Sequence, residues 1–471
     1  MKTLHYPRLD AAHVFSRELL AKSTANLWSW RQGAGEFGQL HLHACWSESS
    51  ALARRYHGQS IHRYHGLLAG IIALYRNSRD PRWLLLTHDI IGNVLYLQTD
   101  DGGFFHASGE FEPTYSCEES CPIHQGLPML GLLNYAEWPE ADPVRVAQIH
   151  LAFERWWRWI ERHWWKRGNA WKKPLEEPGF CGVTNQDLVI VACLAKQAQT
   201  NGDWTRYDQF GSPVLDACLS PACYHSETGL FERGDRSNFA ERSSYYGIIV
   251  PMLKIIHTLT RDGRLPPVID NVVNGLFRAT YVGPDGLRHI AWGATTDLAN
   301  KDKILGWERL PCTFSAYPEL IEIMGDHVRR HSSIEHRSIV CDLEKTLAAY
   351  VFDDGTIPVA LGGDSLFSAI GHAQSLWTFL INRLGKNACL TADIPPLNSL
   401  QRTCGDVVFR ENARHWSVSD RGLQKFAGVK CNPSAIAIGP EESLPGMNSD
   451  SLCEPGLLEI VNPFCQIHSV I

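Results

Sequence analysis

The stretch that decides the fold runs from residue 185 to residue 206 and reads NQDLVIVACLAKQAQTNGDWTR. Residues 188–195 are all apolar, so a helix built from them is hydrophobic on every side and has to be buried. The stretch ends in Asp203-Trp204-Thr205-Arg206, a short polar sequence that is typical of a turn between two helices. The rest of the chain must therefore supply helices that surround this one.

A similar polar turn recurs along the chain at nearly constant spacing. The aspartates that open these turns are separated by 62, 61, 59 and 64 residues, and a degenerate sixth turn follows at Leu384-Gly385-Lys386. A period near sixty residues, repeated this often, indicates a repeat architecture. The other four turns are Asp80-Pro81-Arg82, Asp142-Pro143-Val144-Arg145, Asp262-Gly263-Arg264 and Asp326-His327-Val328-Arg329.

Each turn joins an apolar helix to a more amphipathic one, such as residues 83–98 or 144–165. Buried helices inside a ring of outer helices define an α/α toroid. We therefore predict an all-α fold, an (α/α)6 toroid of six helical hairpins, over residues 1–394. Residues 395–471 are expected to form a small β-rich segment, because short β-like runs at 407–409, 416–418 and 435–438 are broken by Gly, Pro and Asn.

The loops that lead from outer to inner helices are long, at 101–121, 166–183, 221–242, 282–312 and 353–369. Four of them contain a glycine turn, namely Asp101-Gly102, Thr228-Gly229, Asp285-Gly286 and Asp354-Gly355. Long loops usually carry function. All of these lead into the starts of inner helices, so we expect the functional site at that rim.

The inner-helix starts and their loops therefore provide the candidate site residues. Helix N-termini present unsatisfied N–H groups and the positive ends of dipoles, which favour an anionic ligand. Candidates for catalysis are Tyr245, Tyr246, His124, His372 and Asp187. Candidates for substrate binding are Asn185, Gln186, His65, Tyr64, Arg233, Arg236, His289, Trp171 and Trp292.

Structural interpretations compete with several of these roles. Thr184 and Asp187 fit a capping box, which would make Asp187 a helix cap. One of the two tyrosines, Tyr245 or Tyr246, is expected to be core packing, and loop carbonyls can satisfy His65 and His124.

The cysteine-rich stretch before the second inner helix has ligand types that zinc prefers. Cys117, Cys121 and His124 form a C-x3-C-x2-H pattern, but a second ligand pair at standard spacing is missing. We therefore predict no metal. The sequence also lacks a glycine-rich phosphate loop and a G-x-S-x-G elbow, and no cofactor is expected.

The composition of the chain limits the classes of partner that it is expected to bind. A net charge of −7 and the absence of a long Lys/Arg run argue against nucleic acid. No apolar run spans a bilayer and no signal peptide is recognisable, so we expect no membrane partner and a cytoplasmic location. Fourteen cysteines are then free thiols. The expected partner is a small-molecule or oligosaccharide substrate, anionic in character.

On these residues the chain resembles the (α/α)6-toroid carbohydrate-active enzymes over roughly residues 10–390. These include unsaturated glucuronyl hydrolases and the toroids of alginate- and heparin-type lyases. The resemblance implies that Asn185 and Gln186 hold a uronate carboxylate, Tyr245 or Tyr246 moves its α-proton, and His124 or His372 assists.

Two chemistries remain open within that resemblance. Elimination is favoured slightly, because the inner-helix starts hold His, Tyr, Asn and Gln but only one carboxylate, Asp187. A glucuronyl-type hydrolase instead needs two carboxylates, with Glu119, Glu232, Asp235 and Asp297 as further candidates. A sugar epimerase or isomerase, a terpenoid enzyme and a non-catalytic glycan-binding toroid are the remaining alternatives.

Overall fold

A computed structural model describes the chain over residues 14–29, 64–104, 121–167, 175–233, 240–297, 303–351 and 373–388. Between the last ranges it also describes residues 300, 355–357 and 361. It also describes the backbone of short strands between residues 31 and 55 and between 401 and 469. These residues belong to two compact units. The first comprises Met1–Leu97, Phe105–Cys117 and Ala348–Ile471, and the second comprises Gln98–Phe104 and Glu118–Leu347.

The helical part of the first unit is built around α3 (Tyr64–Ser78), which packs against α4 (Pro81–Tyr96) and α14 (Ala373–Leu384). Helix α14 also packs on α2 (Arg17–Ser29). The indole of Trp377 lies where a Cβ on Gly70 would be, and its Nε1 donates to Thr24 Oγ1 at 2.9 Å. Residue 70 therefore has to be a glycine for α3 and α14 to pack this closely.

The strands of the first unit are short and antiparallel. A four-stranded sheet runs in the order β11 (Gln401–Cys404), β12 (Val407–Glu411), β13 (His415–Asp420) and β14 (Leu423–Val429). The predicted β-like runs at 407–409 and 416–418 lie in β12 and β13, whereas 435–438 lies outside the described residues. The remaining pairs are β1 (Arg31–Gly33) with β2 (Glu36–Phe37), β3 (Leu40–Leu42) with β4 (Ala53–Arg55), and β15 (Leu458–Asn462) with β16 (Cys465–Ser469).

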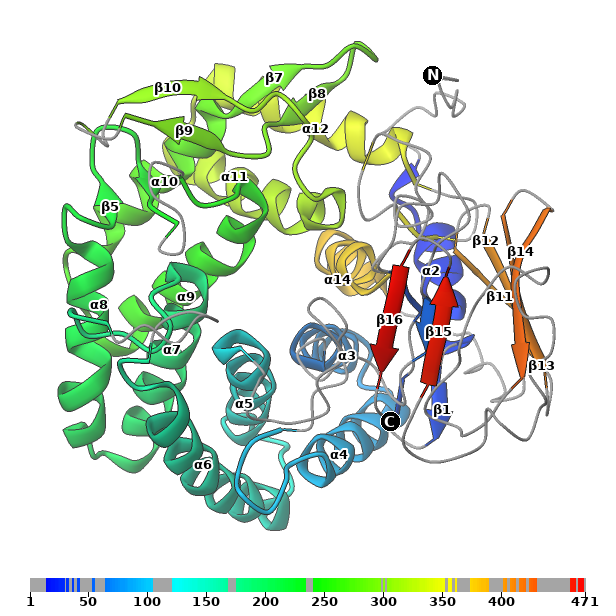
Figure 1. Ribbon diagram of the computed structural model, residues 1–471, viewed down its shortest axis with the longest axis horizontal. Helices are drawn as coiled ribbons and strands as arrows, with labels where there is room; N and C mark the ends of the chain where they lie inside the picture. Colours follow the sequence, from blue (N-terminus) through cyan, green and yellow to red (C-terminus); the bar gives the residue numbers. More distant parts are fainter. Residues whose placement is uncertain are drawn as a thin grey trace. The chain divides into compact units, whose positions relative to one another are not determined.

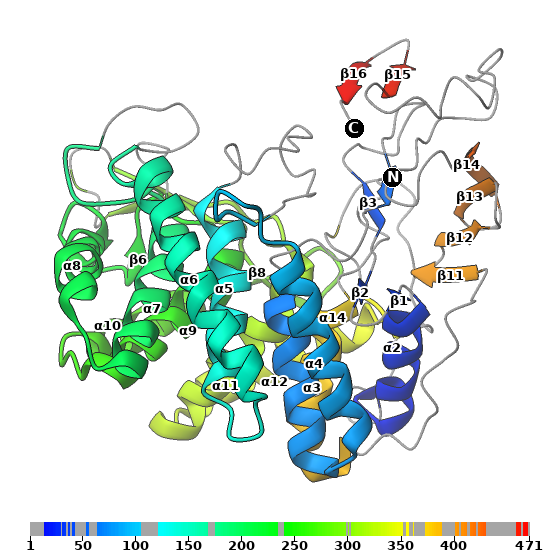
Figure 2. The ribbon, with the colours of Figure 1, turned by 90° about the horizontal axis from the view of Figure 1, so that it is seen from below.

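The second unit is a curved row of parallel inner helices with outer helices behind them (Figures 1 and 2). The inner helices are α5 (Pro122–Ala136), α7 (Thr184–Asn201), α9 (Tyr246–Thr260) and α11 (Tyr317–His331). Outside them lie α6 (Pro143–Trp164), α8 (Ser212–Leu219, preceded by the π-helical turn η3, Tyr207–Gly211) and α10 (Leu265–Arg278), and α12 (Ile334–Ala349) follows α11.

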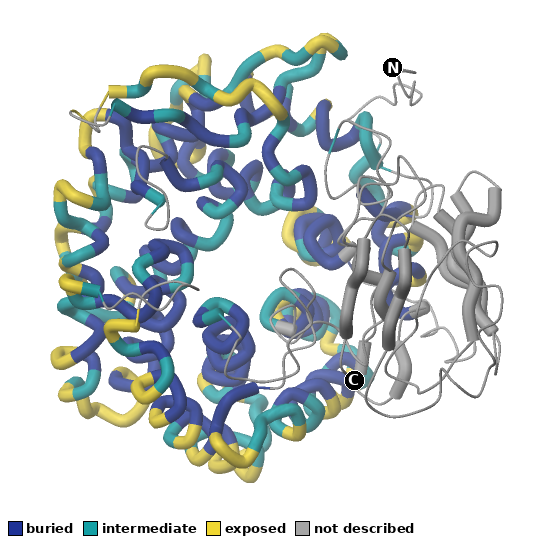
Figure 3. The backbone as a smooth tube through the Cα atoms, in the orientation of Figure 1, coloured by how far each residue is buried: buried dark blue, intermediate teal, exposed yellow. Residues whose placement is uncertain are grey.

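The inner helices start at the same end of the unit. Gly126 in the first turns of α5 faces Val189 and Ile190 of α7, and Gly247 of α9 faces Glu319 of α11. Such contacts between corresponding turns require parallel helices. Helix α7 is buried along most of its length, as its uninterrupted apolar run predicts (Figure 3).

The predicted turns between inner and outer helices are confirmed for the first four repeats. Each aspartate accepts the backbone N–H two residues later, at 2.9 Å for Asp80, 2.8 Å for Asp142, 3.0 Å for Asp203 and 2.9 Å for Asp262. The bonds at Asp80 and Asp142 cap α4 and α6 by satisfying N–H groups that a helix start leaves open, whereas the bond at Asp262 holds Arg264, the residue before α10.

The fifth predicted turn was wrong. Asp326 and Arg329 lie inside α11, where Asp326 pairs with Arg329 at 3.6 Å and with Lys254 of α9 at 2.7 Å. The chain turns instead at Ser332, which has a left-handed φ of 53°. The next residue, Ser333, accepts the His336 N–H at 3.2 Å. In the sequence, an aspartate near arginines has the same pattern whether it caps a helix or forms ion pairs along a helix.

The long loops of the second unit contain antiparallel hairpins that the sequence analysis did not predict. Their strands are β5 (Tyr224–His225), β6 (Leu230–Phe231), β7 (Thr280–Val282), β8 (Arg288–Ile290), β9 (Ala294–Thr296) and β10 (Ile304–Trp307). The predicted glycine turns do form, with φ of 68° at Gly229 and 76° at Gly286. A Cβ on Gly229 would lie 2.2 Å from the carbonyl oxygen of Asn271, so this loop is pressed onto α10.

None of the helices described combines the length and the apolar character that a membrane span requires.

Candidate active site

Each inner helix of the second unit holds the preceding loop through one side chain near its start. Helices α9 and α11 are preceded by the 3-10 turns η4 (Ser243–Tyr245) and η5 (Phe314–Ala316), and with these turns included the side chain is the fourth residue in every case. On α5 this residue is Gln125, which exchanges two hydrogen bonds with the backbone of Phe104. On α9 and α11 it is a buried tyrosine whose phenol oxygen accepts a loop N–H. The acceptors are Tyr246 for Phe231 N–H at 2.9 Å and Tyr317 for Ile290 N–H at 3.1 Å.

Asp187 does the same on α7. Its carboxylate accepts the N–H groups of Cys181 at 2.9 Å and Gly182 at 3.1 Å, and its side chain is buried. Burial raises the pKa of Asp187 to about 6, although these hydrogen bonds favour the charged form. The capping box considered from the sequence is not formed, because Val183 occupies the cap position and the Thr184 hydroxyl lies 3.2 Å from Cys223 Sγ.

The residues immediately before these loop anchors point elsewhere. Tyr245 is half-buried, and the Arg233 guanidinium lies over its ring, 5.6 Å from the centroid. Arg233 is itself held by Glu241, with an Nη1 to Oε1 distance of 3.0 Å. The two adjacent tyrosines therefore have different surroundings, with Tyr246 inside the loop packing and Tyr245 beside a cation.

His124 of α5 and Gln186 of α7 correspond to Tyr245, the last residue of the 3-10 turn η4 before α9. His124 is buried, with Nδ1 3.1 Å from Cys121 Sγ, so its ring orientation is fixed by a residue of its own helix start. Gln186 is partly exposed, and its Oε1 lies 3.5 Å from Cys181 Sγ. Asn185 beside it is buried, and its Oδ1 has no hydrogen-bond partner among the residues described. A buried amide oxygen without a partner is costly unless a ligand satisfies it.

A second arginine stands at the start of α9. The Arg242 guanidinium stacks on the Trp292 indole, 4.9 Å from the ring centroid, and both side chains are partly exposed. The Ser243 N–H donates to the Trp292 carbonyl at 3.0 Å, which ties the tryptophan loop to the helix start. Arg242 Nε has no hydrogen-bond partner in the described parts of the chain. Stacking leaves the edge of a guanidinium available to a carboxylate.

Two carboxylates come to this region from the loop before α9. Glu232 and Glu241 are 5% and 1% exposed. Glu232 Oε2 lies 3.7 Å from Nε2 of the buried His225, and the Glu232 carbonyl accepts from Thr184 Oγ1 of α7 at 3.5 Å. The loop thus brings buried acidic groups between the starts of α7 and α9.

His289, which the sequence analysis predicted as a substrate-binding residue, lies between the β7–β8 hairpin and α11. It is buried, with Nδ1 3.2 Å from the Tyr317 hydroxyl and Nε2 2.9 Å from Asp285. Its Nδ1 thus ties the 282–312 loop to α11, and its Nε2 is engaged by the turn between β7 and β8.

The remaining predicted residues cannot be assigned to this site from the described part of the chain. His372, Trp171, Arg236 and Cys117 lie outside the described residues, as does the side chain of Tyr64. His65 is partly exposed on α3 of the first unit.

The sequence analysis did not choose Glu241 and Arg242 as site residues. A usable signal was present, because a charged pair directly before the first polar turn of an inner helix places both side chains at the helix start. Cys223 was also missed. The neighbouring Cys218 thiol lowers the pKa of Cys223, and burial opposes this effect.

Comparisons with solved structures identify the fold. Cellobiose 2-epimerase from Bacillus thermoamylovorans is 12% identical, with a TM-score of 0.52 over 78% of this chain and 98% of that one. A sugar epimerase from a ruminal bacterium is 10% identical, with a TM-score of 0.52 over 79% of this chain and 98% of that one. No family model and no curated protein sequence matches the chain.

These likenesses confirm the predicted fold class and the predicted resemblance. The fold is that of the (α/α)6-toroid carbohydrate-active enzymes, built from helical hairpins with a minor β-rich part. At 10–12% identity the similarity establishes the fold alone.

Proposed function

We propose that the protein is a carbohydrate-active enzyme that cleaves glycosidic bonds in uronic-acid-containing oligosaccharides by β-elimination. The observation that carries this proposal is the arrangement at the start of α9. Tyr245 lies under the Arg233 guanidinium. Arg242, three residues before Tyr245 in the chain, is stacked on Trp292. This arrangement combines a proton-transfer group with cations for a carboxylate.

The reaction assigns one task to each group. Arg242 binds the uronate carboxylate, and the buried Asn185 contributes its side-chain amide from the neighbouring helix α7. Neutralising the carboxylate makes the α-proton at C5 more acidic. The Tyr245 phenolate takes this proton, the C4–O bond breaks as the C4=C5 double bond forms, and the Tyr245 phenol returns the proton to the leaving oxygen.

Arg233 and Glu241 prepare Tyr245 for this step. A guanidinium over the ring stabilises negative charge on the phenol oxygen, because opposite charges at short range favour the ionised form. Glu241 fixes the position of Arg233 by a buried ion pair at 3.0 Å. Trp292 supplies an aromatic face on which a sugar ring can stack. Tyr246 has no part in the chemistry, because its hydroxyl is already used by Phe231.

The test is incubation of the full chain with uronate oligosaccharides while ultraviolet absorbance of the conjugated C4–C5 product is followed. We expect absorbance to rise with the wild type and to stay flat with Tyr245→Phe. A wild type that leaves every polyuronate unchanged would exclude the proposal.

A glucuronyl-type hydrolase is the second candidate, and the buried carboxylates favour it. Asp187 has a pKa of about 6 because it is buried, so it is partly protonated near neutral pH and suited to a general acid. Glu232 is the second carboxyl group, brought beside α7 by the loop before α9. Hydrolysis of an unsaturated substrate would decrease the same absorbance. In the Asp187→Asn variant this decrease should no longer occur. Under elimination, Asp187→Asn keeps turnover as long as the loop remains folded.

An epimerase is the third candidate, since the two toroid structures compared above are a cellobiose 2-epimerase and a sugar epimerase. Epimerisation by a deprotonation mechanism also begins with removal of a proton from carbon. Incubation in heavy water separates the outcomes. An epimerase incorporates deuterium into intact sugar, whereas a lyase releases an unsaturated fragment.

A further inference from the structure

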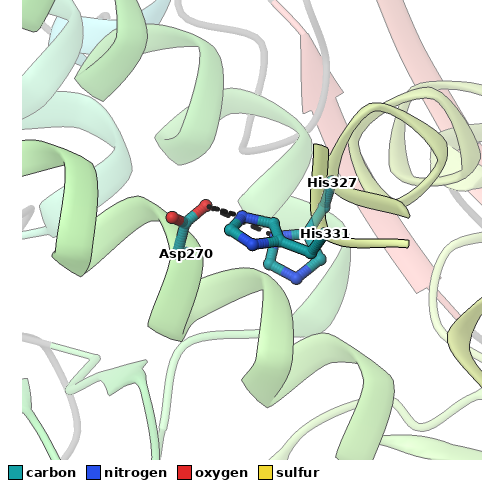
Figure 4. A group of neighbouring side chains, drawn as sticks. All are labelled: Asp270, His327 and His331. Atoms are coloured by element: carbon teal, nitrogen blue, oxygen red, sulfur yellow. Dashed lines mark ion pairs between the residues drawn. The ribbon is translucent and has the colours of Figure 1, made fainter. Parts of the chain in front are cut away.

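A group of potential metal ligands lies at the opposite end of α11 from the candidate active site. His327 and His331 are four residues apart, so both rings lie on the same side of the helix. Asp270 of α10 points toward both of them (Figure 4). Its Oδ1 is 3.4 Å from His327 Nδ1 and 3.2 Å from His331 Nε2.

These distances match those of an assembled coordination site. A tetrahedral zinc ion with bonds of ~2.0–2.1 Å holds neighbouring ligand atoms roughly 3.3 Å apart. One ligand atom from each of the three residues lies within 4.8 Å of the others. We propose that Asp270, His327 and His331 bind a divalent transition-metal ion of the zinc class, with a water molecule in the fourth position.

The buried member of the group supports this assignment. His327 is 3% exposed, and its Nδ1 faces Asp270 Oδ1 at 3.4 Å without meeting the geometry of a hydrogen bond. A buried ring nitrogen of this kind is costly unless something coordinates or bonds it.

Two imidazoles and one carboxylate define the class of ion. Imidazole suits zinc, copper, iron and nickel, whereas calcium and magnesium prefer oxygen ligands alone. His327 lies ten residues along α11 from Tyr317, which corresponds to about 15 Å of helix. The ion therefore takes no part in the reaction proposed above. It would link α10 to α11.

Arg330 competes for the same carboxylate. Its Nη1 donates to Asp270 Oδ1 at 2.9 Å, and its Nε lies 3.8 Å from Asp326 Oδ2. Arg330 is 43% exposed and has Asp326 as an alternative partner, so it can leave Asp270 when a cation arrives. Without metal, Arg330 and the two histidines share Asp270 in an ion-pair network.

The test is calorimetric titration of the full chain with Zn²⁺ after chelator dialysis. We expect one site per chain whose affinity falls at least ~100-fold in His331→Ala, because loss of a ligand exceeds the effect of losing an outer partner. His331 is half-exposed at the helix end, so its removal leaves the core intact. His163→Ala on α6 is the matched control and should bind like the wild type.

Arg330→Gln gives a test in the opposite direction. Freeing Asp270 should tighten Zn²⁺ binding, which a purely structural ion-pair network does not predict. X-ray absorption of the bound ion should show only nitrogen and oxygen ligands at ~2.0–2.1 Å, since thiolates would appear at ~2.3 Å. Equal affinity in His331→Ala and wild type, weaker binding in Arg330→Gln, or a sulfur shell would each overturn the proposal.

Discussion

The phenol oxygen of Tyr246 lies 2.9 Å from the backbone nitrogen of Phe231 and accepts its hydrogen bond. Burial raises the pKa of Tyr246 well above its usual range, so the group stays a neutral phenol. The preceding residue, Tyr245, is partly exposed and lies under Arg233. Two identical side chains in sequence thus divide into a loop anchor and a candidate proton-transfer group.

Replacing each tyrosine by phenylalanine should separate the two roles. Tyr246→Phe leaves the buried Phe231 N–H without an acceptor, which costs ~1–3 kcal/mol of unfolding free energy. Tyr245→Phe removes a hydroxyl at a partly exposed position, so we expect its stability to stay within about 0.5 kcal/mol of wild type. Denaturant unfolding measures both values.

Activity should follow the reverse order in the same pair of variants. Tyr245→Phe should lose turnover, and Tyr246→Phe should retain it at temperatures where it is folded. If Tyr246→Phe lost turnover while fully folded, the assignment of the two tyrosines would have to be exchanged.

The buried carboxyl of Asp187 should make stability depend on pH in a defined window. Its pKa is about 6 in the folded protein, against 3.8 for an aspartate side chain in water. Between these values the folded protein keeps a proton that the unfolded chain has lost. The contribution of Asp187 to stability therefore falls as pH rises from about 4 to 6, by roughly 3 kcal/mol, and is constant above that.

Asp187→Asn is the comparison that isolates this effect, because paired groups such as Asp80 and Asp262 have lowered pKa values and contribute in the opposite direction. The difference in unfolding free energy between wild type and variant should decline across the window. A difference that stays flat from pH 4 to pH 7 would show that Asp187 is not desolvated as described.

The fold was predictable because its signal is repeated. An inner helix such as α7 is apolar on every side, and aspartates such as Asp142 cap the following helices at nearly regular intervals. The one failure, at Asp326, came from a residue that pairs with Lys254 along the helices instead of capping one. Periodicity counts residues and does not distinguish a cap from an ion pair.

The candidate site was less predictable for a physical reason. Sequence position placed Asp187, Tyr245 and Tyr246 at helix starts but did not show which way each side chain points. The direction is set by hairpins such as β5–β6, whose backbone N–H groups need acceptors. Strands this short show little hydrophobic pattern in the sequence. Which helix-start side chains hold a loop and which are exposed could therefore be seen only in the structure.

Arg242 should control affinity for anionic substrates. Its guanidinium stacks on Trp292, and its Nε has no hydrogen-bond partner in the described residues. Arg242→Gln should weaken uronate binding by about 10- to 100-fold, equivalent to ~1.4–3 kcal/mol, since hydrogen bonds to charged groups contribute this much. The measurement is KM, or Kd for a product fragment.

Arg242→Lys should restore only part of the affinity, because an ammonium does not form two parallel bonds to a carboxylate. Arg158→Gln, an exposed arginine on α6, removes the same charge elsewhere and should leave KM unchanged. If the two glutamine variants bind equally well, Arg242 is not the carboxylate partner.

Two glycines of similar backbone conformation should differ sharply when changed to alanine. Gly229 has a φ of 68° and Gly286 a φ of 76°, so each substitution carries the left-handed strain of about 1–2 kcal/mol. A Cβ on Gly229 would lie 2.2 Å from the Asn271 carbonyl oxygen, whereas nothing lies within 4 Å of one on Gly286. We expect Gly229→Ala to destabilise by a further ~1–3 kcal/mol, as overpacking does. Denaturant midpoints at equal slope give the difference. Equal losses in the two variants would mean that the β5–β6 loop is free to move away from α10, and the loop-anchor role of Tyr246 would then lose its support.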